Sequence, residues 1–473
     1  MTGSKASRLR SAVAVALPWV TGVWVLIELL SLRLGLLNRI FFDTLHADVQ
    51  GIDYYSLPKA WLNLASGRSA YATFDPPAYG PHFTWYLAHP VLSVVLGWPL
   101  SRLEPTDSYG LFTILSMAVM GISAWVLARE SDDVFVRRMI WLLLLGAFPT
   151  FEMLFVGNVQ SLTVLGLALL FGGMLQVVKQ RQHASGLILA GLLVSLFTKP
   201  VVLLMFPLLL LLGETRRAAL QAIAVYVPVS LIFETVPALN PEPIGLDRVM
   251  WLALHPGFVR RTMDIYQNHL ALTPDMRDNS IHWFNLIAQS GFRLKHIDVF
   301  SLPVFLDTAF GVRTPSWIYV LPTIVVLALS VMVGRIRDEQ VRREDALLIV
   351  LAASLSFFLS YTTVWEYQYT AVLPVGAVLL LVGSSKVAGP TMRRWMLGLV
   401  VLIWLPSLYF LSGSADPSAS VATMVRLDRV VPVTILFVLL VIAATRAAVS
   451  GQRPSPSVAP PRRDCSSPVG SRA

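Results

Sequence analysis

Long apolar runs, separated by short polar segments, restrict the fold of this chain more than any other sequence feature. A membrane-spanning helix needs about 20 predominantly apolar residues. Hydrophobic residues make up 55% of the 473 residues and charged residues only 14%, a balance that soluble domains of this size do not have. The sequence therefore predicts an all-α polytopic membrane protein. The runs lie near residues 13–36, 108–128, 138–154, 159–178, 186–198, 200–212, 218–237, 316–334, 346–361, 368–383, 395–411 and 430–449.

The charges between these runs predict their orientation. A further run over residues 86–103 contains two prolines. If it does not cross the membrane, the basic clusters at 129–138, 179–181, 216–217, 335–343 and 386–394 and the C-terminal tail all fall on the side of the basic N-terminus. That distribution is the positive-inside pattern. It favours about twelve transmembrane helices in a multi-pass cell-membrane protein, both termini in the cytoplasm, and an interfacial or re-entrant helix at 86–103. The runs at 186–198 and 200–212 are short for spans, and Lys199-Pro200 between them marks a bend, so we expect a tilted hairpin there.

This topology divides the chain into a transmembrane unit and a tail. Residues 1–450 form the transmembrane domain, with two outer segments at 38–107 and 238–315 that are rich in Trp, Tyr, His and Pro. The extracytoplasmic face is therefore expected to be the active face. Residues 451–473 are rich in Pro, Ser and Arg and are predicted to be a disordered cytoplasmic tail, because they bury too little apolar area to offset the entropy of ordering.

Several classes of protein are disfavoured by the same composition. The net charge of +9 comes from short basic clusters beside apolar runs, which act as topology signals and do not indicate a nucleic-acid surface. The single cysteine, Cys465, excludes an internal disulfide. We find no Cys/His metal cluster and no P-loop, GxSxG or HExxH motif, so we expect no metal and no cofactor. The N-terminal run is too long for a signal peptide and is expected to remain as the first span.

Polar side chains gather at the predicted outer ends of the spans. Ionisable groups next to hydrocarbon are costly and point to function. A carboxylate, amides and a cation at one membrane face suit a lipid substrate that carries a phosphate. These groups are Asp53 in the first outer segment, Asn158 and Gln160 between the third and fourth runs, Lys199 at the bend, and Glu366 and Tyr367 between the ninth and tenth runs.

Three short motifs resemble a known family. The chain has DYY-x4-AWL-x-LASGRSAY over residues 53–71, GNVQS over residues 157–161 at the start of a run, and Lys-Pro after a Leu-rich run. This pattern resembles the family-87 polyprenyl-phosphate-mannose-dependent mannosyltransferases, integral-membrane enzymes of the C-type glycosyltransferase superfamily. The similarity covers about residues 10–220, and residues 316–383 more loosely.

The resemblance implies an architecture and a reaction. It implies the C-type glycosyltransferase architecture, with interfacial helices in the first outer segment. A hexose, with mannose favoured, would move from a polyprenyl-phosphate-sugar to a lipid or glycan acceptor at the outer face, with inversion. The lipid-linked donor is then a co-substrate, and an Asp in the first outer segment is the general base. Asp53 matches that position, and Asp48 is the alternative base.

The remaining roles follow from the same comparison. Lys199 would stabilise the leaving phosphate, and Asn158 and Gln160 would hold sugar or phosphate oxygens. Glu366, Tyr367 and His82 complete the predicted substrate-binding set. The chain differs from similar proteins in two places: GNVQ replaces the usual Gly-Gln-x-Asn, and Glu366-Tyr367-Gln368 stands where a His is common.

Three of these residues also fit purely structural roles. Asp53 and Asn158 also fit helix N-caps, and Lys199 fits a helix-end lysine that reaches the interface.

Three other functions stay open at this stage. One is an arabinofuranosyltransferase that uses a polyprenyl-phosphate-arabinose donor. Another is a transporter or flippase of lipid-linked saccharides, a class in which related halves and broken mid-membrane helices are expected; we see no such repeat. The third is an inactive homologue that acts as a scaffold.

Overall fold

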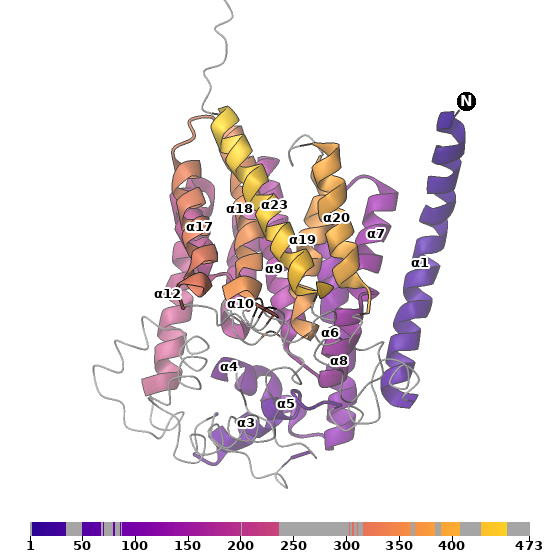
Figure 1. Cartoon of the computed structure of the whole chain (residues 1–473). Coiled ribbons are helices and arrows are strands. Elements are labelled where there is room, and N and C mark those ends of the chain that lie inside the picture. The colour runs from indigo at the N-terminus through magenta and orange to yellow at the C-terminus, as the bar shows by residue number, and fades with distance from the viewer. Residues whose placement is uncertain are drawn as a thin grey trace, which may run out of the picture.

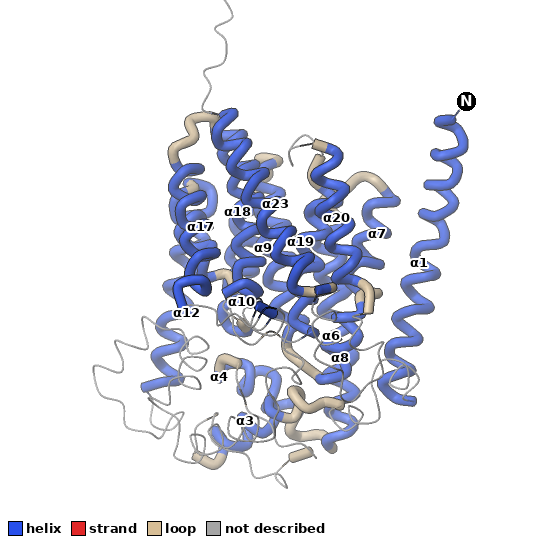
Figure 2. Tube along the Cα trace, in the orientation of Figure 1, coloured by secondary structure: helices blue, strands red, loops and turns tan. Residues whose placement is uncertain are grey.

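The structure is a computed structural model in which all regular secondary structure of the described residues is helical (Figure 2). It describes residues 2–34, 50–67, 70, 79–80, 86, 88–199, 201–235, 302, 305–306, 310, 316–360, 364, 366–383, 389–406 and 427–451. The elements are α1 (Thr2–Leu34), α3 (Ser56–Ala65), α4 (Pro90–Leu92), η3 (Ser93–Gly97), α5 (Trp98–Leu100), α6 (Pro105–Ala128), α7 (Val134–Leu145), α8 (Phe148–Val156), α9 (Gln160–Val178), α10 (Ala184–Thr198), η4 (Leu203–Met205), α11 (Phe206–Leu211), α12 (Gly213–Thr235), α17 (Ser316–Gly334), α18 (Glu339–Ser360), η6 (Glu366–Val372), α19 (Leu373–Leu381), α20 (Pro390–Trp404) and α23 (Val430–Gly451). These residues confirm the predicted all-α fold.

Four helical segments in the described ranges are long and apolar enough to cross a membrane. They are Ser7–Leu34, Pro105–Ala128, Val134–Val156 and Gln160–Val178. Ala184–Thr198, Leu321–Gly334 and Val430–Arg446 are shorter apolar helices. The chain is therefore a membrane protein, and the number of twelve spans stays a prediction.

The predicted span at 200–212 folds into two short helices instead of one long one. η4 is a three-residue 3-10 turn, and α11 has six residues. At about 1.5 Å per residue, α11 is far shorter than the ~30 Å hydrocarbon core of a bilayer.

The helices form a bundle with a distinct cap of short helices at one end (Figure 1). The start of α1 and the end of α23 lie at the other end of the bundle. The α4–η3–α5 segment is one helical stretch over residues 90–100, and its length of about 16 Å is half of what a crossing requires. It packs on α3 so closely that a Cβ on Gly97 would lie 2.5 Å from the carbonyl oxygen of Leu57.

Small residues bring α9 and α10 into close contact. A Cβ on Gly166 would lie 2.2 Å from Ser195 Oγ, and one on Gly191 would lie 2.5 Å from the backbone nitrogen of Leu170. Glycines allow such an approach between helices in a membrane. Because the two helices are consecutive and antiparallel, the start of α9 and the end of α10 fall at the same end of the bundle. Thr163 Oγ1 donates to Thr198 Oγ1 across them at 3.3 Å.

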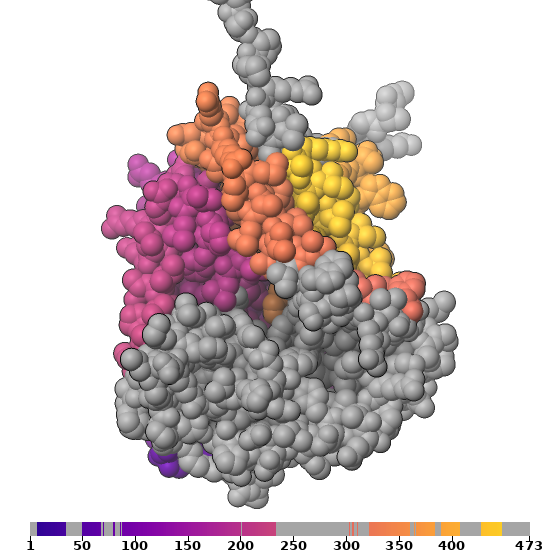
Figure 3. All heavy atoms as spheres, turned by 60° about the vertical axis from the view of Figure 1, so that its left-hand side comes forward, coloured from indigo at the N-terminus to yellow at the C-terminus, as the bar shows by residue number. Residues whose placement is uncertain are grey.

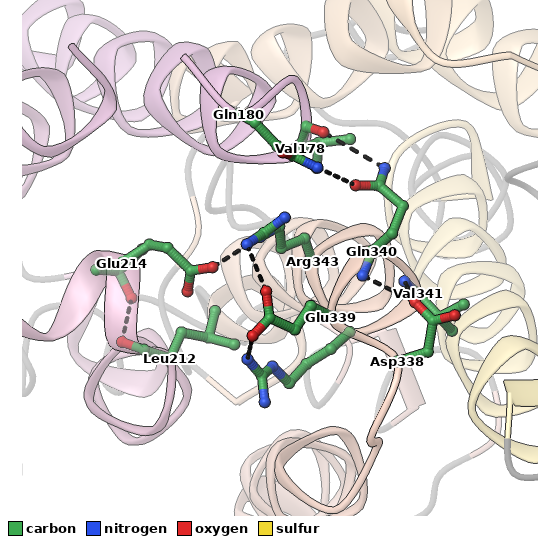
Figure 4. A network of polar contacts seen from close by, with 11 residues as sticks. Val178, Gln180, Leu212, Glu214, Asp338, Glu339, Gln340, Val341 and Arg343 are labelled. Carbon is green, nitrogen blue, oxygen red and sulfur yellow. Dashed lines mark hydrogen bonds and ion pairs between the residues drawn. The ribbon is translucent and has the colours of Figure 1, made fainter. Parts of the chain in front are cut away.

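A polar network fixes the bundle at the end that carries the start of α18 (Figure 4). Arg343 donates from Nε to Glu214 Oε1 at 2.7 Å and from NH2 to Glu339 Oε2 at 3.0 Å. Gln340 Nε2 donates to the carbonyl of Val178 at 3.4 Å. The network thereby joins α18 to α12 and to the end of α9. On the face seen in Figure 3, side chains of α17 and α18 (orange) fill the space between the earlier helices and α23 (yellow).

Candidate active site

Asp53 lies in a turn that is held against the last residues of α8. The backbone amide of Gly51 donates to the carbonyl of Phe155 at 2.8 Å, and that of Asp53 donates to the carbonyl of Val156 at 2.9 Å. The hydroxyl of Tyr109 also donates to the Phe155 carbonyl, at 2.9 Å. The last carbonyls of a helix have no partner within it, so the turn and α6 supply donors to α8. These bonds fix the backbone that carries Asp53.

Gly157 makes this close approach possible. It follows α8 with φ of 72°, in the left-handed region, and a Cβ there would lie 2.4 Å from the Cβ of Tyr54. The hydroxyl of Tyr54 in turn contacts the hydroxyl of Ser108, where both side chains are buried. Glycine is the residue that meets both demands, because it has no Cβ and tolerates positive φ.

We therefore expect Gly157→Ala to destabilise the protein by about 1–3 kcal/mol, since it adds backbone strain and a clash with Tyr54. The matched control is Gly110→Ala in α6, where no atom lies within 4 Å of the added Cβ. Thermal unfolding in detergent measures both variants. A Gly157→Ala protein with the wild-type Tm would contradict the close packing of this turn.

Asn158 joins Asp53 to the start of α9. Its Nδ2 donates to Asp53 Oδ2 at 2.7 Å, and its Oδ1 accepts from the backbone amide of Gln160 at 2.9 Å. The sequence predicts Asn158 as the N-cap, but Val159 holds that position without a side-chain bond; Asn158, one residue earlier, bonds the first amide of α9 instead. One amide side chain therefore bonds both the first backbone amide of α9 and the Asp53 carboxylate.

Lys199 and Tyr367 complete the group around Asp53. Lys199 follows α10 in an extended conformation and is 8% exposed. Its Nζ lies 5.2 Å from the centre of the Tyr367 ring and has no hydrogen-bond partner among the described residues. The Tyr367 side chain hydrogen-bonds the Asp53 carboxylate, and the Lys199 charge acts on the same carboxylate.

Burial shifts the pKa of Asp53 and the pKa of Lys199 in the direction that favours the uncharged form of each group. It raises the pKa of Asp53 above its usual range, while the Asn158 hydrogen bond, the Lys199 charge and the Tyr367 hydrogen bond oppose the rise. Burial lowers the pKa of Lys199 to about 8, against the effect of the Asp53 charge. A carboxylate with a raised pKa accepts protons more readily than an exposed one. The site thus pairs a buried carboxylate with a buried cation whose Nζ has no hydrogen-bond partner among the described residues.

Two further predicted residues, Gln160 and Glu366, are connected with η6. Gln160 is 2% exposed and donates from Nε2 to the carbonyl of Gln368 at 3.4 Å. Glu366 is fully buried, and its Oε1 accepts from Nε of Arg429, which is also fully buried. The role of Glu366 in substrate binding stays a prediction. Sequence reasoning missed Arg429, whose only signal was a charged residue just before the last apolar run.

The structure thus brings together Asp53, Asn158, Gln160, Lys199 and Tyr367, which come from four separate parts of the chain. Asp48, the alternative base, and His82 lie outside the described residues. So does most of the predicted outer segment at 238–315 and the predicted tail at 451–473, apart from Gly451. Within the described ranges, no group of three or more His, Cys, Asp or Glu is arranged to hold a metal ion.

Comparison with known proteins gives a family match. Residues 86–362, more than half of the chain, match the sequence model of glycosyltransferase family 87. No curated protein matches the chain.

Two solved structures are similar at low identity. One is the crystal structure of the Archaeoglobus fulgidus oligosaccharyltransferase in the apo form, with 13% identity and a TM-score of 0.35. The other is the archaeal oligosaccharyltransferase AglB from Archaeoglobus fulgidus in complex with an inhibitory peptide and a dolichol-phosphate, with 12% identity and a TM-score of 0.34. Each match covers 91% of this chain, which spans 56% of the length of either relative.

Proposed function

The chain belongs to glycosyltransferase family 87, and we propose that it transfers a hexose, with mannose favoured, from a polyprenyl-phosphate-sugar to a lipid or glycan acceptor. One observation carries this proposal: Asp53, held by Asn158 at 2.7 Å, shares a site with the buried, unbonded Lys199 ammonium. A base and a phosphate-binding cation are the two groups that this transfer requires.

The transfer is a single displacement. The oxygen of an acceptor hydroxyl attacks C1 of the sugar, and the bond between C1 and the phosphate oxygen breaks. The polyprenyl phosphate leaves with the electron pair, and the Asp53 carboxylate takes the proton of the hydroxyl. Attack from the side opposite the leaving group inverts the configuration at C1.

Lys199 acts on the other half of the reaction. Negative charge grows on the phosphate oxygens as the bond to C1 breaks, and a fixed cation in a site of low polarity stabilises that charge strongly. Hydrogen bonds between an ammonium and a phosphate are among the strong ones in proteins. In this scheme the Gln160 and Asn158 amides, at the start of α9, contact sugar or phosphate oxygens. No metal or other cofactor takes part in this scheme.

We assign the site to the extracytoplasmic face and both termini to the cytoplasm. The chain as a whole is proposed to have a C-type glycosyltransferase architecture. The start of α1 and the end of α23 lie at the end of the bundle away from the α3–α5 cap (Figure 1). Basic residues of the predicted cytoplasmic clusters, among them Lys179 and Arg343, lie at the end of α9 and the start of α18. Both features support this orientation under the positive-inside rule.

The test is transfer of radiolabelled mannose from polyprenyl-phosphate-mannose to a membrane lipid extract by the purified protein. We expect a labelled product that forms only with active protein and donor together. Parallel reactions with polyprenyl-phosphate-arabinose and polyprenyl-phosphate-glucose identify the sugar. Absence of product from all three donors, together with movement of the lipid across liposomes, would overturn the transferase in favour of a flippase.

A further inference from the structure

Arg429 is a fully buried cation whose guanidinium group is bonded on every side. Its Nε donates to Glu366 Oε1, its NH1 donates to the carbonyl of Leu402 at 3.1 Å, and its NH2 donates to the carbonyl of Leu405 at 2.6 Å. NH1 also donates to the carbonyl of Asp428 at 3.1 Å. The planar fork of arginine suits such convergent acceptors, which a lysine would satisfy less completely.

These bonds join three elements that are distant in sequence. Leu402 lies in the last turn of α20 and Leu405 directly follows its last residue; helix carbonyls lack partners at this end, and the helix dipole favours a cation there. Arg429 itself directly precedes α23, and its carbonyl accepts from the amide of Val433 at 3.2 Å. Its remaining bond reaches Glu366, the first residue of η6. One side chain therefore anchors η6 to the junction of α20 and α23.

The segment that it anchors carries part of the candidate site. Tyr367 follows Glu366 directly, lies over the Lys199 ammonium and hydrogen-bonds Asp53. The carbonyl of Gln368 accepts from Gln160 at 3.4 Å. A 3-10 helix has poor internal hydrogen-bond geometry and is seldom long, so the orientation of η6 depends on the contacts that hold its ends.

We propose that Arg429 is a positioning residue for sugar transfer: through Glu366 it sets the rotation of η6 and thereby the placement of Tyr367 against Lys199 and Asp53. This inference rests on the proposed function. Arg429 does not touch the substrate; it acts through its ion pair with Glu366.

Two variants test the role. Arg429→Lys keeps the charge and removes the fork. Arg429→Met/Glu366→Met removes both buried charges and retains similar volume, a replacement that buried ion pairs often tolerate without loss of stability. We expect kcat to fall by about 10–100-fold in both, because displacement by about 1 Å is enough for such a loss. The double variant decides the question if Arg429→Lys does not fold.

The pH profile separates positioning from general stability. The Tyr367 hydrogen bond lowers the pKa of Asp53, so displacement of Tyr367 raises that pKa and moves the acid limb of kcat/KM to higher pH. The control is Arg343→Lys in the network of Figure 4, near the start of α18 and about 26 Å along the helix from the end that leads to η6. It disturbs a partly exposed arginine–glutamate ion pair far from the site, and we expect its acid limb to match the wild type.

The possible results separate failure of the positioning role of Arg429 from failure of the proposed sugar transfer. Lower kcat with a shifted acid limb in a folded Arg429 variant supports the positioning role. Wild-type kcat and an unmoved acid limb in the folded double variant would overturn that role while the transferase stands. A wild-type protein that transfers no sugar from any donor overturns the proposed function, and the positioning role with it.

Discussion

Replacing Asp53 with asparagine is expected to lower kcat for sugar transfer by about 10³-fold, within the range that a general base contributes. Asparagine has nearly the size of aspartate and still accepts the hydrogen bond from Asn158, but it cannot take the proton of the acceptor hydroxyl. Because the loss is confined to the chemical step, the KM for the donor should change by no more than about threefold. Initial rates with purified protein and polyprenyl-phosphate-mannose measure both constants.

The matched controls are two other carboxylates of the same region. Asp48→Asn changes the alternative base, and Asp107→Asn changes an exposed carboxylate in the first turn of α6. Both variants should keep the wild-type kcat. Loss of transfer in Asp48→Asn together with retained transfer in Asp53→Asn would reassign the base to Asp48.

The apolar runs predict the boundaries of several helices to within a few residues. The run at 159–178 corresponds to α9, which begins at Gln160 and ends at Val178, and the run at 108–128 corresponds to α6 within three residues at its start. Continuous apolar residues set the length of such a helix, and polar residues such as Asn158 mark its beginning. Pro105, at the first position of α6, is a start signal that the hydropathy pattern alone does not use.

Breaks inside apolar runs were not predicted, because hydropathy does not respond to them. The run at 138–154 is divided into α7 and α8 at Gly146 and Ala147, although Pro149 in the first turn of α8 is a local signal for a new helix. The Thr150 side chain donates to the Leu144 carbonyl at 2.8 Å across the break. The break lets α8 end beside the Asp53 turn, so it is part of how the site is built.

The pairing of the site residues depends on tertiary contacts that no local pattern contains. The hydrogen bond between Asn158 and Asp53 joins residues 105 positions apart. Membrane topology predicted that both lie at one face, and the family resemblance singled them out, but neither specified the bond. The pairing of Arg429 with Glu366 was missed because a charge between two apolar runs looks the same in sequence whether it is solvated or buried.

Replacing Lys199 with methionine is expected to lower kcat/KM for the lipid-linked donor by about 10²-fold, equivalent to roughly 2.7 kcal/mol of transition-state stabilisation. Methionine fills a similar volume in a buried position but offers no charge to the phosphate. Lys199→Arg is the matched variant, since it retains the charge and should recover part of the activity. Donor titrations at fixed acceptor concentration measure the effect. Equal values for Lys199→Met and the wild type would remove Lys199 from phosphate binding.

The pH dependence gives an independent test of the same residue. The profile of kcat/KM reports the ionisation of the free enzyme. The base requires ionised Asp53, so activity is lost as the pH falls through the raised pKa of that carboxyl. Phosphate binding requires protonated Lys199, so activity is lost as the pH rises through about 8. Arginine stays charged throughout this range, and Lys199→Arg should therefore keep the acid limb and lose the alkaline one. An alkaline limb that persists near pH 8 in Lys199→Arg would assign it to another group.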